Sequence, residues 1–129
     1  MAELEINNPS TAPQPNRPLS MVVRWGNLVF ASGQVPRRAN GEEETGGIEA
    51  QTKVVMENLE AVLHAAGSSL ANTVKTTVFL TDMADINGMD KVYADALGDH
   101  RPARSAVQIA ALGKPAFRVE IEAIAVVDE

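Results

Sequence analysis

Apolar residues recur at helical spacing in two parts of the chain, and these two segments are predicted to be helices. The first runs from Ile48 to Ala66, and Gly67 follows it at the position where a helix commonly ends. The second runs from Ile86 to Leu97, and Gly98 ends it. The apolar positions are Ile48, Val55, Leu59, Val62, Leu63 and Ala66 in the first helix, and Met89, Val92, Tyr93 and Leu97 in the second.

Stretches rich in β-branched residues surround these helices and predict the strands of a sheet. The segments 22–24 and 28–32 flank a turn containing glycine, which is typical of a hairpin. Further strands are expected at 73–80, within 101–110 and at 118–127. The order β-β-α-β-α-β-β predicts one α+β domain over residues 1–129, a single sheet with two helices packed on one face. Residues 1–18 contain four prolines and are expected to form an extended arm.

The last predicted strand has two different faces. Val119, Ile121, Ala123, Ala125 and Val127 lie on one side, and Glu120, Glu122, Ile124 and Val126 lie on the other. Two helices cover only one face of the sheet, yet the second side of this strand also carries apolar residues. An uncovered apolar face is normally buried by a partner, so a closed homo-oligomer is expected.

Composition narrows the possible partners. The chain of 129 residues has a net charge of −6, and its basic residues form no stripe, so nucleic acid is not expected as a partner. There is no cysteine, no apolar run of membrane-spanning length and no apolar segment typical of a secretory signal, so a cytoplasmic protein is expected. His64 and His100 lie in no metal-ligating pattern, and no metal site is predicted.

Arg104 lies within a predicted strand and is the first candidate for chemistry. Strand alternation sets Arg104 opposite Val107 and Ile109, which we interpret as the second face of the sheet, the face that also carries Glu120. If the two strands are neighbours, a guanidinium and a carboxylate meet in a sheltered place. This pattern alone fits either a structural ion pair or a binding site.

Four motifs together resemble the Rid/YjgF family, whose best-known members are the RidA-type enamine/imine deaminases. They are Ser-Gly-Gln-Val-Pro at 32–36, Val-Lys-Thr-Thr-Val-Phe-Leu-Thr-Asp-Met at 74–83, Arg-Pro-Ala-Arg-Ser-Ala-Val at 101–107 and Glu-Ile-Glu-Ala-Ile-Ala at 120–125. The resemblance implies a chorismate-mutase-like fold and a homotrimer with sites at the subunit clefts. It also implies hydrolysis of 2-aminoacrylate-type enamines and imines to 2-keto acids and ammonia, with no metal or organic cofactor.

The resemblance assigns roles to four residues. Arg104 matches the arginine that grips the substrate carboxylate, for which a planar fork is suited. Gly33 matches the glycine whose backbone lies against the ligand, and Ser32 beside it offers a hydroxyl. Glu120 matches the glutamate that directs a water molecule at the imine carbon.

Three positions depart from the family pattern. Leu19 stands where a tyrosine often lines the pocket, Asp90 replaces an asparagine, and Ala106 replaces a cysteine. Leu19 and Asp90 favour an alternative, a non-catalytic trimer that binds small carboxylates or a protein partner through the same cleft. A third hypothesis, a ribonuclease or translation inhibitor, is disfavoured by the acidic charge and by the lack of an aromatic and basic surface.

Overall fold

A six-stranded sheet with the strand order β1-β2-β3-β6-β4-β5 forms one layer of the molecule. The computed structural model describes residues 3–128. All neighbouring strands are antiparallel except β4 and β5, which are parallel and are joined through α2. The strands are β1 (Leu4–Asn7), β2 (Val22–Trp25), β3 (Leu28–Gln34), β4 (Thr73–Leu80), β5 (Ala103–Gln108) and β6 (Val119–Val126), and the helices are α1 (Ile48–Ala65) and α2 (Ile86–Leu97).

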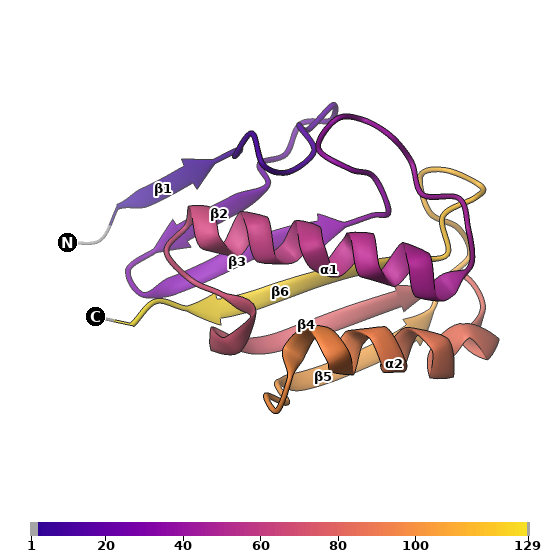
Figure 1. Cartoon of the computed structure of the whole chain (residues 1–129). Coiled ribbons are helices and arrows are strands. Elements are labelled where there is room, and N and C mark those ends of the chain that lie inside the picture. Colours follow the sequence, from indigo (N-terminus) through magenta and orange to yellow (C-terminus); the bar gives the residue numbers. More distant parts are fainter. Residues whose placement is uncertain (1–2, 129) are drawn as a thin grey trace.

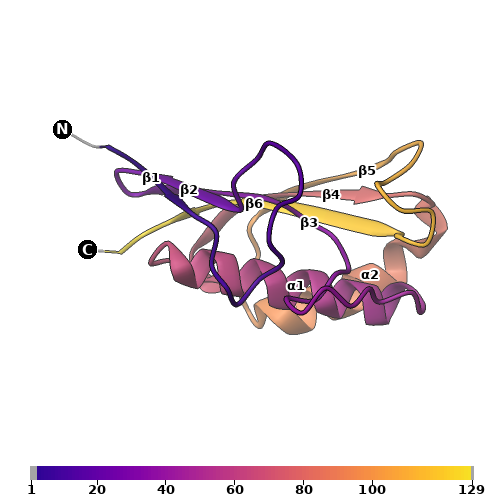
Figure 2. The ribbon, with the colours of Figure 1, turned by 90° about the horizontal axis from the view of Figure 1, so that it is seen from above.

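Both helices lie on the same face of this sheet, as the sequence predicts (Figures 1 and 2). The α+β class is therefore confirmed. The predicted bounds of β4 and α2 agree with the structure, and α1 ends one residue earlier than predicted. Gly67 has a φ of 87°, so it takes the left-handed conformation that ends a helix without strain in the backbone. None of the helices within residues 3–128 is long and apolar enough to cross a membrane.

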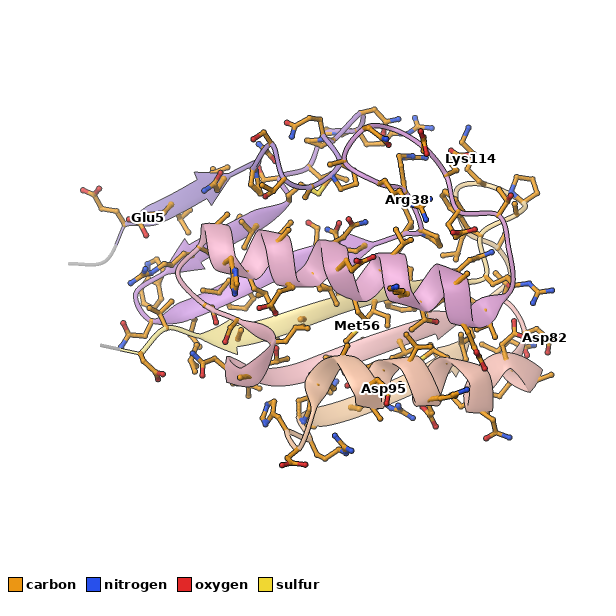
Figure 3. The ribbon with its side chains drawn as sticks, in the orientation of Figure 1. Glu5, Arg38, Met56, Asp82, Asp95 and Lys114 are labelled. Carbon is orange, nitrogen blue, oxygen red and sulfur yellow. The ribbon has the colours of Figure 1, made fainter. Side chains whose placement is uncertain are left out.

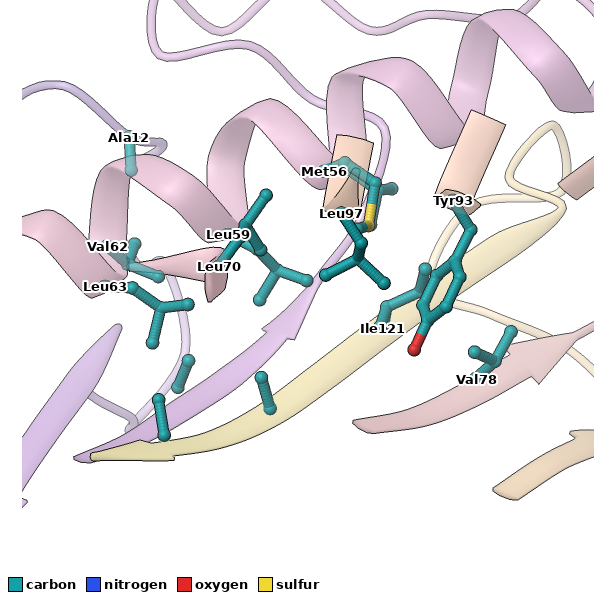
Figure 4. Close-up of a cluster of buried hydrophobic side chains, with 14 of the residues drawn as sticks. Ala12, Met56, Leu59, Val62, Leu63, Leu70, Val78, Tyr93, Leu97 and Ile121 are labelled. Atoms are coloured by element: carbon teal, nitrogen blue, oxygen red, sulfur yellow. The ribbon is translucent and has the colours of Figure 1, made fainter. Parts of the chain in front are cut away.

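The core lies between the helices and the sheet face that they cover (Figure 4). Val55, Leu59, Val62 and Leu63 of α1 are fully buried there. From the sheet, alternate residues of β6 point toward α1, and Ala123 and Ala125 among them are small enough for the helix to pack closely. The inward side of β6 therefore follows the predicted alternation.

Residues 4–7 form a strand that the sequence prediction did not include. Residues 1–18 were expected to be an extended arm, but β1 pairs with β2, with Leu4 opposite Trp25 and Ile6 opposite Val23. The proline-rich segment that follows is irregular, and Asn8 anchors its far end because its side-chain oxygen accepts a hydrogen bond from the Met21 amide at 2.8 Å. The arm is thus an edge strand followed by a loop, and Met1 and Ala2 lie outside the described residues.

The second face of the sheet carries apolar side chains across almost its whole width. The pairing register places residues from every strand on this open face: Leu4, Ile6, Val23, Trp25, Leu28, Phe30, Phe79, Val107, Ile124 and Val126. Six of them are among the exposed large apolar side chains, and Phe30, near the middle, is 44% exposed. An apolar surface of this extent is normally covered by protein.

We expect the chain to self-associate through the open face. Phe30→Glu should shift it to a smaller species, because burying the charge would cost at least about 1–3 kcal/mol per copy. Light scattering coupled to size exclusion measures the mass, and circular dichroism checks the fold. Lys53→Glu, on the exposed side of α1, is the control that should keep the oligomer. A monomeric wild-type protein at micromolar concentration would contradict this prediction.

Candidate functional site

Arg104 lies on the outermost strand, β5, and its side chain turns toward α2. Its register partner on β4 is Thr76, which is buried beneath the helices, so Arg104 is on the helix-covered face. Its Nη1 donates a hydrogen bond to Asp90 Oδ1 at 2.6 Å, and the two side chains are 28% and 43% exposed. Arg104 is thus held at the rim of the sheet and is not buried.

Tyr93 forms a platform beneath the guanidinium. The Arg104 Cζ lies 5.1 Å from the centre of the Tyr93 ring, within cation–π distance. The Tyr93 hydroxyl lies 2.6 Å from Thr76 Oγ1 inside the core, and this hydrogen bond fixes the ring. Figure 4 shows Tyr93 projecting from α2 toward the sheet. Asp90 and Tyr93 are three residues apart on α2, so both face the same arginine.

Sequence reasoning treated Tyr93 as a packing residue, and its contact with Arg104 was missed. The spacing of Asp90 and Tyr93 is the signal that was present in the sequence. Since positions i and i+3 share one face of a helix, an aromatic ring and a carboxylate there form a suitable place for a guanidinium. Nothing in the sequence shows, however, that β5 places Arg104 under that face.

Glu120 lies in a second cluster with Gly33, on the open face of the sheet. The pairing of β3 with β6 is irregular between Ala31 and Gln34, and Gly33 lies in this irregularity. A Cβ atom on Gly33 would be 2.3 Å from Glu120 Oε2, so any side chain at position 33 would displace the carboxylate. Desolvation, and secondarily the charge of Glu122, raises the pKa of Glu120 above its usual value.

Ser32 and Leu19 lie beside this second cluster. The Ser32 hydroxyl donates to the carbonyl of Ser20 at 2.6 Å and so fastens the segment just after the arm to β3. Its proton is therefore committed within the chain, although its oxygen can still accept a hydrogen bond. Leu19, next to Ser20, is 46% exposed. Leu19 is therefore attached to the backbone that Ser32, the neighbour of Gly33, holds through Ser20.

The structure contradicts the prediction that Arg104 and Glu120 share a face of the sheet. Glu120 is paired with Phe79 on the open face, whereas Arg104 is paired with Thr76 on the helix-covered face. Their strands are not neighbours either, because β4 lies between β5 and β6. Within one chain these two residues do not form an ion pair, and the predicted residues fall into two separate half-sites. We call them the arginine half-site (Arg104, Asp90, Tyr93, Thr76) and the glutamate half-site (Glu120, Gly33, Ser32, Leu19).

Neither histidine belongs to a half-site. His64 Nε2 lies 2.6 Å from a carboxylate oxygen of Glu60, one turn earlier on α1, and the His100 ring contacts the Thr73 carbonyl at 2.6 Å. Across residues 3–128 there is no group of three or more metal-ligating side chains of the His, Cys, Asp and Glu types.

A groove of about 860 Å³ lies elsewhere, between α1 and α2. Met56 and Leu97 line it, and Glu57 and Asp95 are at its rim. Figure 3 shows Met56 and Asp95 on either side of the space between the helices. No residue of either half-site lines this groove. This groove therefore does not coincide with the predicted site in a single chain.

Comparison with known proteins places the whole chain in one group. A family model described as endoribonuclease L-PSP matches residues 9–127. A RutC family protein of Pyrococcus horikoshii is 43% identical over 122 residues, which cover 94% of this chain and 96% of that protein. The human 2-iminobutanoate/2-iminopropanoate deaminase is 38% identical over 120 residues, covering 91% and 87%. The crystal structure of Escherichia coli TdcF with bound serine has a TM-score of 0.89 and 37% identity, covering 96% of this chain and 99% of that one.

The raised pKa of Glu120 predicts that Glu120→Gln stabilises the fold at neutral pH. The folded protein retains this proton at a higher pH than the unfolded chain does, so ionisation of Glu120 lowers the free energy of unfolding as pH rises through the folded pKa. The glutamine variant avoids this loss. Denaturant unfolding should therefore show a gain at pH 7–8 that disappears below about pH 4, where the carboxyl is protonated in both states. Glu122→Gln, an exposed neighbour, is the control. An equal gain at both pH values would contradict the prediction.

Proposed function

This chain belongs to the Rid/YjgF family, whose model is described as endoribonuclease L-PSP, and we propose that it hydrolyses reactive imines to 2-keto acids and ammonia. The proposed substrates are 2-aminoacrylate-type enamines, after tautomerisation, and the corresponding imines. The human relative named for this activity aligns over nine-tenths of the chain. The observation that carries the proposal is the pair of half-sites, one with a guanidinium and the other with a carboxylate that is easily protonated.

The arginine half-site provides the anchor for the substrate carboxylate. Asp90 uses only Nη1 of the guanidinium, and no residue within 3–128 is hydrogen-bonded to Nε or Nη2. These two groups point in the same direction and form the fork that binds both oxygens of a carboxylate. Because Tyr93 supports the guanidinium from below, the fork is held in place before the ligand arrives.

The glutamate half-site provides the acid and base. Glu120 as a carboxylate takes a proton from a water molecule, and the water oxygen attacks the carbon of the iminium form, C=NH₂⁺, to give a neutral carbinolamine. The protonated Glu120 then gives this proton to the carbinolamine nitrogen, and the C–N bond breaks to release ammonia. As the C=O bond forms, the hydroxyl proton of the carbinolamine passes to the Glu120 carboxylate and from there to solvent. The raised pKa of Glu120 favours protonation of the leaving nitrogen, because the protonated form of Glu120 costs less free energy to form near neutral pH.

A complete site requires both half-sites, and we propose that two copies of the chain supply them. Glu120 lies on the open apolar face, which a second copy is expected to cover. Arg104 lies on β5 at the edge of the sheet, where it can reach across a subunit boundary. The proposed assembly is a homotrimer with one site in each of its clefts.

The Arg104–Asp90 contact supports a second candidate, a non-catalytic trimer that binds small carboxylates or a protein partner. A guanidinium that already contacts a carboxylate at 2.6 Å attracts a further anion less strongly. The family is described as an endoribonuclease, but the net charge of −6 does not favour binding of the RNA phosphates. RNA cleavage is therefore not part of the proposal.

We expect Arg104→Ala and Glu120→Gln each to abolish most imine hydrolysis. An amino-acid oxidase generates 2-iminopropanoate in situ, and the appearance of the keto acid is followed with and without the protein. Loss of the fork should raise KM roughly 30-fold or more, and loss of the acid/base should lower kcat by about 100-fold or more. Arg101→Ala is the matched control, because the Arg101 side chain is hydrogen-bonded, among residues 3–128, only to the carbonyls of Gly98 and His100.

The two candidates give different results in this assay. Acceleration by the wild-type protein that both variants lose supports the deaminase. No acceleration, with binding of small carboxylates that Arg104→Ala removes, supports the non-catalytic trimer. Full activity in either variant would refute the assignment of that residue.

A further inference from the structure

Among residues 3–128, Asp90 is the one acidic group that forms an ion pair with Arg104, the proposed carboxylate anchor, and its negative charge affects which ligands can bind. We propose that Asp90 makes the site select zwitterionic ligands, with the carboxylate bound by Arg104 and the cationic α-nitrogen facing Asp90. This inference rests on the proposed function only in placing the ligand carboxylate on Arg104. It specifies the substrate class as the protonated iminium form, C=NH₂⁺, of a 2-imino acid.

The geometry leaves room for both contacts. Asp90 is bound to Arg104 through Oδ1 alone, and no residue within 3–128 is hydrogen-bonded to its Oδ2. The Asp90 side chain is 43% exposed, so its second oxygen is accessible to a ligand. The adjacent cation on α2, Lys91, pairs with Glu49 and does not neutralise Asp90. A ligand whose carboxylate occupies the Nε and Nη2 fork leaves this oxygen unoccupied, so the oxygen remains available to a cationic group of the same ligand.

The charges favour a zwitterion over an anion. Arg104 and Asp90 together are neutral, so a ligand bearing only a carboxylate is attracted by one and repelled by the other. A ligand with a carboxylate and a cationic nitrogen attached to the next carbon complements both charges. The ring face of Tyr93 beneath the guanidinium is also electron-rich, and it adds no attraction for an anion.

This arrangement distinguishes the substrate from the product of the proposed reaction. The iminium carries a positive charge at the α-nitrogen, and hydrolysis replaces that nitrogen with a neutral carbonyl oxygen. The keto acid therefore keeps the carboxylate but loses the group that faces Asp90. Asp90 thus weakens retention of the product at the same arginine that bound the substrate.

The test compares two stable ligands of the same shape, L-alanine and L-lactate, which differ in an ammonium against a hydroxyl group. Calorimetric titration of the wild-type protein should show that L-alanine binds about tenfold more tightly than L-lactate. This factor lies between the effect of a fully exposed ion pair on affinity and the effect of an unscreened ion pair. Asp90→Asn should remove this preference by weakening L-alanine and strengthening L-lactate. Asp95→Asn, on the same helix, makes the same change in net charge away from Arg104 and should leave the preference unchanged.

The outcomes separate this inference from the deaminase proposal, because neither ligand reacts. The proposed role of Asp90 would be overturned if Asp90→Asn kept the full preference for L-alanine, or if Asp95→Asn changed the preference equally. It would also be overturned if the wild-type protein bound neither ligand or preferred L-lactate. Imine hydrolysis without the alanine preference refutes the role of Asp90 alone. The preference without imine hydrolysis refutes the deaminase and leaves the zwitterion site standing. Loss of both ligands in Arg104→Ala confirms that they bind at this half-site.

Discussion

Side chains alternate between the two faces of a strand, and in β6 this alternation positions the core, the open apolar face and Glu120. One side of the strand contributes Ile121, Ala123 and Ala125 to the core beneath α1. The other side contributes Ile124 and Val126 to the open apolar face, together with Glu120. Because β6 lies between β3 and β4, the same strand sets the core, the surface for association and the position of the candidate base.

Partial burial of a carboxylate on the open, largely apolar face has a free-energy cost, and this cost indicates a role for Glu120. Glu120 is partly desolvated, and its carboxylate lies against Gly33, where no side chain could fit. A structural carboxylate in such a place would normally have a cationic partner, but within residues 3–128 Glu120 forms no ion pair, and Arg104 is on the other face of the sheet. The arginine is held in turn by Asp90 and Tyr93. In the proposed site, the arginine half-site binds the substrate carboxylate and the glutamate half-site supplies the acid and base.

The regular elements were predictable from the sequence, because their periodicity is strong. The pattern of α1 and the β-branched run of β4 gave bounds within one residue of those observed. The four residues of β1 were missed because the prolines after them dominate that segment. Helix ends and strand cores depend on local patterns of this kind, so they could be found without a structure.

The face on which Arg104 lies could not be predicted, and the reason is physical. Alternation shows that Arg104 and Val107 point in opposite directions, but it does not show which direction leads to the core. Val107 is apolar and was therefore taken to face the helices. The open face is itself apolar, however, so Val107 lies there beside Phe79. The separation into half-sites follows from this register, which only the three-dimensional pairing reveals.

The most direct test of the account is a mixing experiment with two inactive variants. Arg104→Ala retains Glu120, and Glu120→Gln retains Arg104. If each site joins two copies, dissociating and reassembling an equal mixture should restore up to about one quarter of wild-type imine hydrolysis, because that share of the boundaries pairs an intact arginine with an intact glutamate. Reassembly of each variant alone should restore none. Mixed oligomers, verified by mass, that stay as inactive as their parents would contradict a site shared between copies.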